Sequence, residues 1–407
     1  MSRLGVLTAW AISRVTLVLL LPSTLETGIL DDVRHYFNWA ARAWSGHGLP
    51  GRAFAWEYPP GAALVLLPTA LDGVASYVVT FVCLMIIVDA AVLLVLLRRS
   101  REHADNSGVW LWVAVPFLLG PVALSRFDLV PTLLSTLAVA AAPVAPIALA
   151  AGTMVKLWPA TIVPLLAVVS KRPVRFLLRY GVLLLALVAV AAATGLLPSL
   201  WTAVQHQQRR GVEIESLAAL PQLWASRLGD GHHVAFSYGS WQVGGTLTDI
   251  LGVTLPGLGL LGLLLLTRRQ QVLRQAGYAV DGVLAAAATV TLVVATDKVL
   301  SPQYLLWPAG LVGLAAGRKW VGRRQAMTAL AAAAALTHVV YPLSFVRLLH
   351  GELLPLIALT IRDALLIWLL ALLWRAAWSP GAPLADKIQS EVYRTARLRP
   401  APVGGPP

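Results

Sequence analysis

The sequence predicts an all-α polytopic membrane protein, from its composition and from the length of its apolar segments. Of the 407 residues, 58% are hydrophobic and 13% are charged, whereas roughly a quarter of a soluble chain is charged. Several apolar runs reach the about 20 residues that a helix needs to cross roughly 30 Å of hydrocarbon. Strands of a membrane barrel alternate in polarity over about 10 residues, so these uninterrupted runs predict helices.

The basic residues predict which side of the membrane each loop faces. Short loops rich in Lys and Arg stay cytoplasmic, and the net charge of +13 comes from such loops between apolar runs. The clusters are Arg98, Arg99 and Arg101; Lys171, Arg172, Arg175 and Arg179; Arg268, Arg269 and Arg274; and Arg318, Lys319, Arg323 and Arg324. They form no continuous stripe, so nucleic-acid binding is not expected. The single cysteine, Cys83, excludes an intrachain disulfide and a thiolate metal cluster.

About 11 membrane-spanning helices are expected, within a range of 9 to 13. Clear spans are 4–22, 74–97, 176–197, 250–267, 278–296, 304–317, 326–346 and 353–377. The first is interpreted as a retained span with a cytoplasmic start, because Arg14 interrupts it and no signal-cleavage site follows before Pro22.

Two regions are less regular. Residues 61–71 are apolar but short, and 109–170 contain seven prolines. Broken or re-entrant helices are expected there, and such breaks usually line a cavity. Residues 1–378 form the predicted transmembrane domain, and 379–407 a Pro- and Gly-rich cytoplasmic tail that is predicted to be disordered.

With the N-terminus in the cytoplasm, the outer loops of a plasma-membrane protein would be 23–60, 197–245, 297–303 and 342–352. Within the first, residues 30–45 suit a short amphipathic helix at the membrane interface. Its apolar face would hold Val33, Tyr36, Phe37, Ala40 and Trp44. Asp31 and Asp32 stand at its start, where carboxylates can cap free amides.

Several short motifs follow one another along the chain. An Asp-Val-x-x-Tyr-x-x-Trp-Ala segment begins at Asp32, just after the first span, and Tyr58-Pro-Pro-Gly follows it. Further segments are Ser125–Asp128, Lys156–Pro159, Arg210–Ser216 and Asp297–Trp307. The motifs, in this order, resemble those of the GT87 family, and the resemblance covers about residues 4 to 375. The members of this family are polyprenol-phosphate-mannose-dependent mannosyltransferases of actinobacteria.

The resemblance implies a GT-C-like helical bundle with an interfacial helix in the first outer loop. It also implies an inverting glycosyltransferase acting outside the cytoplasm. A sugar, with mannose expected, would pass from a polyprenyl-phosphate donor to a glycolipid or cell-envelope glycan. The donor would be a co-substrate, and no cofactor is implied.

Inverting transfer needs a carboxylate that takes the proton of the acceptor hydroxyl as general base. The resemblance to GT87 implies that this base belongs to the first outer loop. The spacing of Asp32 to Tyr36 matches the motif, so Asp32 is preferred to Asp31, which could orient a sugar hydroxyl or cap the helix.

The departing phosphate needs cationic or hydrogen-bonding groups. The candidates are Lys156, Arg126, Arg210 and Lys298. Three of them have a plainer alternative. Lys156 could extend toward water from a helix break, Arg126 could pair with Asp128, and Lys298 could form a surface pair with Asp297. Pro302 would break the helix after Lys298 and leave carbonyls to line a cavity.

Resemblance also points to Arg210, Glu215 and Ser216 as substrate contacts, whereas Arg209 and Glu213 are interpreted as a solvated helix face. The expected substrate-binding set is Asp31, Tyr36, Tyr58, Arg126, Asp128, Lys156, His206, Arg210, Glu215, Ser216, Lys298 and Gln303.

Metal dependence is not expected. Adjacent carboxylates such as Asp31 and Asp32 point in different directions on a helix, and a hard cation needs several oxygens. His232 and His233 have no third ligand at suitable spacing, so they are interpreted as loop residues.

Two other functions stay open. One is a multi-span transporter or lipid-linked-sugar flippase, whose pathway residues would be Arg14, Asp89, Lys156 and Asp363. Transporter sites lie near the bilayer midplane, whereas the unusual polar residues here gather in the outer loops. Asp89 is expected to pair with Arg14 between helices, although a proton relay is an alternative. The other function is a non-catalytic scaffold for envelope synthesis.

Overall fold

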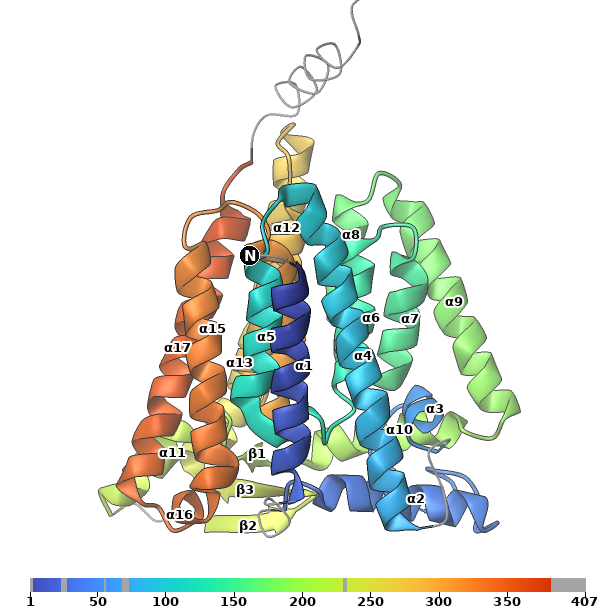
Figure 1. The fold of residues 1–407 in the computed structure, drawn as a ribbon, viewed down its shortest axis with the longest axis vertical. Helices are drawn as coiled ribbons and strands as arrows, with labels where there is room; N and C mark the ends of the chain where they lie inside the picture. Colours follow the sequence, from blue (N-terminus) through green and yellow to red (C-terminus); the bar gives the residue numbers. More distant parts are fainter. Residues whose placement is uncertain (1–2, 23–27, 55, 68–72, 230–232, 382–407) are drawn as a thin grey trace, which may run out of the picture.

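A computed structural model of the protein describes residues 3–22, 28–54, 56–67, 73–229 and 233–381. The chain is mostly helical, at 75%, and its long helices stand side by side (Figure 1). The predicted disordered tail lies outside the described residues from residue 382 onward.

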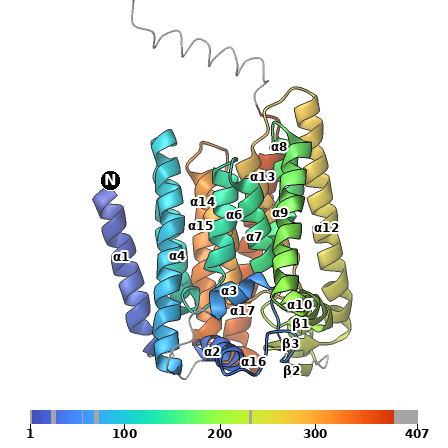
Figure 2. The same cartoon turned by 90° about the vertical axis from the view of Figure 1, so that its right-hand side faces the viewer.

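Six helices of the described chain are long and apolar enough to cross a membrane. They are α1 (Arg3–Leu20), α4 (Val74–His103), α9 (Pro173–Ala193), α12 (Thr246–Gln275), α15 (Arg323–His338, extended by η5, Val339–Leu343) and α17 (Leu353–Trp378). Figure 2 shows α1 beside α4 at one edge of the bundle and α9 with α12 at the opposite edge. A helical membrane protein is therefore supported, while the count of 11 spans stays a prediction.

Shorter helices fill the space between these six. They are α5 (Ser107–Leu119), α6 (Leu129–Ala140), α7 (Ala145–Val155), α8 (Val163–Val169), α13 (Gly282–Thr296) and α14 (Leu306–Ala316). At 1.5 Å per residue, even the longest extends only about 23 Å, less than the roughly 30 Å of hydrocarbon.

Three breaks interrupt the short helices, and each contains a short 3₁₀ helix. These 3₁₀ helices are η2 (Gly120–Ala123), η3 (Trp158–Ile162) and η4 (Pro302–Leu305). A proline lies in the first two positions of each one, and proline cannot continue the preceding helix. The broken helices predicted within 109–170 are thus confirmed. The breaks also place Arg126 and Asp128 in buried positions and bring Lys156 beside Asp128.

The remaining elements gather at one end of the bundle, the loop end (Figure 1). They are the helices α2 (Asp31–Trp44), α3 (Gly61–Leu66), α10 (Leu197–Arg209), α11 (Leu220–Arg227) and α16 (Phe345–Leu349), and the strands β1 (Val212–Glu213), β2 (His233–Ser237) and β3 (Ser240–Gly244).

The strands form an antiparallel sheet in the order β1-β3-β2. An all-α interpretation missed this sheet. Strands β2 and β3 are joined by Tyr238 and Gly239, both with positive φ (48° and 74°). Two such residues make the tight turn that matches the twist of a hairpin.

The four basic clusters lie at the opposite end, the basic end, where α1 also begins (Figure 1). Ion pairs fasten loops there: Arg318 Nη1 lies 2.8 Å from Asp281 Oδ1, and Arg323 Nη1 lies 2.5 Å from Asp105 Oδ2. The clusters therefore share one end, as expected for loops on one side of a membrane.

A buried ion pair joins α1 to α4. Arg14 Nη2 and Nε each lie 2.9 Å from an oxygen of Asp89, and both side chains are almost fully buried. Trp10 donates to the same carboxylate, and Arg14 also donates to the carbonyl of Val113. The predicted pairing is confirmed. Both charges have several partners, as a buried pair requires.

Candidate functional site

The first predicted site element is the amphipathic helix over 30–45, and α2 confirms it. Its buried face holds Val33, Tyr36, Trp39 and Ala40, with Trp39 in place of Trp44, which is exposed. Asp31 and Asp32 stand in the first turn as predicted, but neither caps the helix, whose N-cap is Leu30. Both carboxylates are therefore available for other partners.

Asp32 is paired with Arg126. Its Oδ2 lies 2.5 Å from Arg126 Nε, with 45% of the Asp32 side chain exposed and 7% of the Arg126 side chain. Arg126 Nη1 also donates to the carbonyl of Ile29, at 2.8 Å, and to that of Ser125, at 3.0 Å. The suggested Arg126–Asp128 pair is wrong. The break after η2 instead brings the guanidinium to the first turn of α2.

Asp31 lies in a different environment. Its carboxylate, 65% exposed, lies 3.0 Å from Arg34 one turn along α2. An exposed pair of this kind contributes little to stability. The two adjacent carboxylates thus differ, since only Asp32 contacts a buried cation.

Asp128 and Lys156 form a second pair deeper in the bundle. Lys156 Nζ lies 2.6 Å from Asp128 Oδ1, and Trp307 Nε1 donates to the same oxygen at 2.6 Å. The ammonium also lies 4.7–5.4 Å from the ring centroids of Phe127, Tyr304 and Trp307. Cation–π contacts stabilise a desolvated cation. Lys156 therefore points inward, and the suggestion that it extends toward water is wrong.

Tyr36 and Tyr58 pack between these two pairs. Their ring centroids are 6.3 Å apart, and Tyr58 packs edge-on against Phe127 at 4.8 Å. Gly61 ends the Tyr-Pro-Pro-Gly motif, and a Cβ there would lie 2.5 Å from the carbonyl oxygen of Met154. Glycine thus lets the motif approach the end of α7, directly before Lys156. The two predicted tyrosines form an aromatic wall of the site.

Glu57 faces His206 beside this wall. Its Oε1 lies 3.5 Å from His206 Nε2. Burial, together with nearby Asp32, raises the pKa of Glu57 to about 7, although Arg210 opposes the shift. Burial and Arg210 lower the pKa of His206 to about 4. His206 is therefore neutral at pH 7, and the contact is not an ion pair.

Arg210 follows α10 and lies near two acidic side chains. The carboxyl groups of Glu213 and Glu57 interact electrostatically with its guanidinium. Its Nε is buried without a hydrogen-bond partner among the described residues. Arg210 also lines a cavity of about 350 Å³ beside the sheet, together with Lys298 and Asp249. A half-buried guanidinium with a free Nε donor suits an anionic ligand.

Glu213 was interpreted as part of a solvated face, and that interpretation is wrong. Its side chain is buried in β1, and Ser301 Oγ donates to both carboxylate oxygens at 3.2 Å. Burial raises the pKa of Glu213, while Arg210 opposes the shift. Arg209, by contrast, is exposed as expected.

Lys298 positions the loop after α10. Its Nζ donates to the carbonyl of Arg210 at 2.6 Å and to that of Gln208 at 3.2 Å. This is neither the suggested surface pair with Asp297 nor a cation free for phosphate. Burial lowers the pKa of Lys298, although Asp297 opposes the shift.

The other predicted contacts are Ser216, Glu215 and Gln303. Ser216 is buried and donates to the carbonyl of Glu213 at 2.8 Å, which closes a turn. Glu215 is buried near Arg362 and Asp363. Gln303 is nearly buried, and its Oε1 has no hydrogen-bond partner within the described chain.

The structure thus gathers Asp32, Arg126, Glu57, His206 and Arg210 near the aromatic wall. The Asp128–Lys156 pair meets the same wall at Phe127, against which both tyrosines pack. Sequence reasoning missed Glu57 and Glu213. Glu57 stands inside the aromatic motif before Tyr58, and that position was its available signal.

No group of three or more His, Cys, Asp or Glu side chains that could hold a metal ion occurs in the part of the chain that the structure describes. His233 begins β2, and His232 lies outside the described residues. No protein-family model matches the sequence, and no curated protein matches it.

Proposed function

We propose that this protein is an inverting glycosyltransferase with a polyprenyl-phosphate sugar as donor and a glycolipid or envelope glycan as acceptor. The observation that supports it best is the Asp32–Arg126 pair, where a partly exposed carboxylate contacts a buried guanidinium at the loop end. Mannose as the sugar, and a GT-C-like bundle of about 11 spans in the plasma membrane, belong to the same proposal and rest on the resemblance to GT87.

The two charges suit the two halves of the reaction. The acceptor oxygen forms a bond to the anomeric carbon while the bond from that carbon to the phosphate oxygen breaks. Asp32 takes the hydroxyl proton as general base, and polyprenyl phosphate leaves with the bonding electrons. A phosphate that binds Arg126 competes with Asp32 for the guanidinium, and this frees the carboxylate for the acceptor.

Other cations support binding of the donor phosphate. Arg210 has a buried Nε without a partner among the described residues. Lys156 lies over the ring of Phe127, against which Tyr36 and Tyr58 pack. Preorganised cations in a water-poor site stabilise the charge that develops on a leaving phosphate.

The charge distribution supports the side on which the reaction occurs. Lys- and Arg-rich loops stay cytoplasmic, so the basic end would face the cytoplasm. The N-terminus would lie on that side and the loop end would face outward. The polyprenyl chain would then lie in the bilayer beside the helices.

A transporter or lipid-linked-sugar flippase is the second candidate, and one observation favours it. Asp363 is buried within α17 and pairs with neighbouring Arg362, at 2.9 Å. Its two oxygens accept no hydrogen bond from the described residues. An ionisable group inside a span is costly to bury, which makes it a candidate for a functional residue. Arg14 and Asp89 fit a pathway less well, because both charges are fully paired.

A reconstitution assay distinguishes the two candidates. Purified protein in liposomes receives radiolabelled polyprenyl-phosphate-mannose and a total lipid extract as acceptor, and heat-treated protein is the control. We expect label in a new product that grows with time. Label that crosses the bilayer on an unchanged donor, without a product, would support the flippase instead.

A further inference from the structure

The basic end holds a second cavity, of about 640 Å³, far from Asp32. It is bounded by the turn between α6 and α7, the connection from α8 to α9, and the start of α13. Figure 1 shows these segments at the end of the bundle opposite the sheet. Its volume falls within the range of about 300–1,000 Å³ that is typical of sites for small ligands.

The lining of this cavity divides into an apolar part and a cationic part. Pro146, Leu166, Val169 and Phe176 supply apolar surface. The cationic part is Lys171, Arg172, Arg175, Arg179 and Arg318. No acidic residue is among the described residues that line the cavity. An amphipathic ligand with a negative head matches both parts.

Four of these cations have no acidic partner in the described chain: Lys171, Arg172, Arg175 and Arg179 are exposed and form no ion pair there. Asp281 lies close by, but it pairs with Arg318 and accepts a hydrogen bond from the first turn of α13, so it does not neutralise these four cations. The positive charge at the cavity is therefore not balanced by the protein.

Two helix starts add to this charge. Both α7 and α9 begin at the cavity, and neither has a side-chain cap. Pro146 and Pro173 supply no N–H in these first turns, and the Ala145 amide already donates to the carbonyl of Ala142. The helix dipole still favours an anion at such an N-terminus. Arg274 also lies at this end, but its guanidinium already donates to the carbonyls of Val168 and Ser170, so it is not counted among the cations that would bind the anion.

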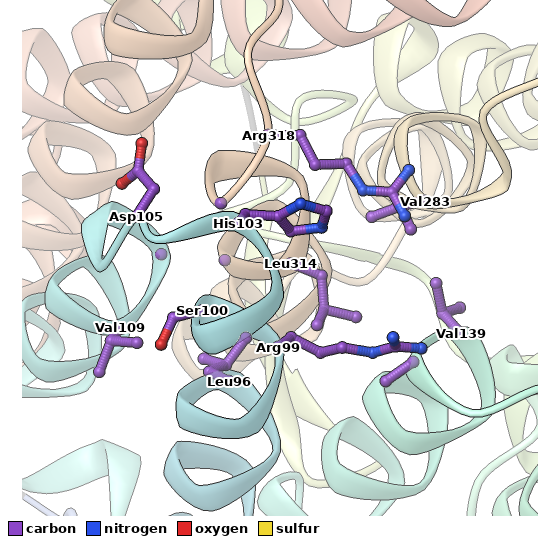
Figure 3. A pocket seen from close by; sticks show the side chains of 14 residues that line it. Leu96, Arg99, Ser100, His103, Asp105, Val109, Val139, Val283, Leu314 and Arg318 are labelled. Atoms are coloured by element: carbon purple, nitrogen blue, oxygen red, sulfur yellow. The ribbon is translucent and has the colours of Figure 1, made fainter. Parts of the chain in front are cut away.

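A neighbouring small pocket extends the cationic wall. It shares Val139, Val283 and Arg318 with the larger cavity. Figure 3 shows the guanidinium groups of Arg99 and Arg318 pointing to the same side, toward Val139 and Val283. Both arginines thus face the wall that the two cavities share.

We propose that this cavity binds an acidic phospholipid, with the phosphate among the four unpaired cations and an acyl chain along the apolar lining. The outer side of α9 suits such a chain, since only Phe176 and Ala191 of this helix are buried. Basic pockets between helices at a membrane surface recognise anionic headgroups in this way. The site is independent of the transfer reaction at the loop end.

The test is a lipid titration of the purified full chain in neutral detergent, followed by native mass spectrometry. The probes are phosphatidylglycerol, phosphatidylcholine and soluble glycerol phosphate. Arg175→Gln/Arg179→Gln removes two cavity cations. Arg268→Gln/Arg324→Gln removes two cations at the same end that do not line either pocket, and it serves as the matched control.

We expect wild type to bind phosphatidylglycerol at least tenfold more tightly than phosphatidylcholine. The cavity double variant should raise the Kd by about 25-fold, since each of the two cations is worth about fivefold. The control variant should change it less than twofold. Arg175→Lys/Arg179→Lys keeps the charge and should restore binding, which separates lost binding from lost folding.

Three results would overturn the proposal. Equal loss in the two double variants would mean general attraction to the basic end. Equal binding of the two phospholipids would remove the role of the headgroup charge. Equal affinity for glycerol phosphate would make the acyl chain irrelevant, and the ligand a free phosphate ester.

Discussion

The Nε atom of Arg126 lies 2.5 Å from Oδ2 of Asp32, and Nη1 of the same guanidinium donates to the carbonyl of Ile29. Arg126 thus holds the first turn of α2 against the break after η2. A single cation both places the proposed base and stands where a donor phosphate would bind.

Arg126→Lys should lower kcat/KM for the donor by about 10–100-fold, because a charged hydrogen bond is worth roughly 1.5–3 kcal/mol. Lysine keeps the charge but cannot hold the carboxylate and the Ile29 carbonyl with one planar group. Steady-state kinetics check this, with Arg34→Lys as the control, since Arg34 forms only an exposed pair. Full activity of Arg126→Gln would disprove the role of this cation.

Lys156→Met should destabilise the protein by about 3–5 kcal/mol, because it leaves the buried carboxylate of Asp128 without its cation. Asp128→Asn in the same chain should recover part of this loss. Unfolding in detergent of the two single variants and the double variant measures the coupling. Simple additivity of the two single changes would mean that the pair contributes nothing.

Glu57 should make stability depend on pH. Its pKa is raised to about 7 in the folded protein, chiefly by burial, from an ordinary 4.5. The folded state then binds the carboxyl proton more tightly than the unfolded state does. The free energy of unfolding of wild type therefore falls as pH rises from about 4.5 to 7, and this group causes no further fall above pH 7. Glu57→Gln removes this loss. Its Tm should therefore rise relative to wild type across that window.

The matched control for Glu57 is Glu102→Gln, which changes an exposed carboxylate at the basic end. Tm is measured in steps between pH 4 and pH 8 for all three proteins. If the Tm difference between wild type and Glu57→Gln stays constant over this range, Glu57 does not titrate with a raised pKa.

Asp89→Asn should cost about 3–5 kcal/mol of folding free energy, because Arg14 is left buried without its partner. Sugar transfer per folded molecule should stay unchanged, since the pair joins α1 to α4 and does not reach the loop end. Thermal unfolding and transfer are measured on the same preparation. Lost transfer in a fully folded variant would favour the pathway role that the transporter hypothesis gives to Asp89.

The local features of this fold could be predicted from the sequence. The spacing of apolar residues in α2 determines which face of that helix is buried. The prolines at 121, 159 and 302 cannot continue the preceding helices. Both effects involve residues that are close in the sequence. The Arg14–Asp89 pair could also be predicted, because a charge inside an apolar span is costly unless it pairs with an opposite charge.

Long-range contacts could not be predicted in this way. Asp128, two residues from Arg126, was its obvious partner, yet the break brings Arg126 to Asp32. Glu213 looked solvated, but β1 pairs with β3 thirty residues later, and the strand turns this side chain inward. Short helices such as α7 resemble spans in composition, and their length alone separates them from the six long helices.

The most direct test of the central claim compares wild type with Asp32→Asn and Asp31→Asn in the transfer assay with labelled polyprenyl-phosphate-mannose. The asparagine at position 32 keeps the shape of the side chain but cannot take the acceptor proton, so turnover should fall by about 10²–10⁴-fold. Asp31→Asn, at an exposed position, should lower it far less. Equal turnover of wild type and Asp32→Asn would contradict the assignment of Asp32 as the base.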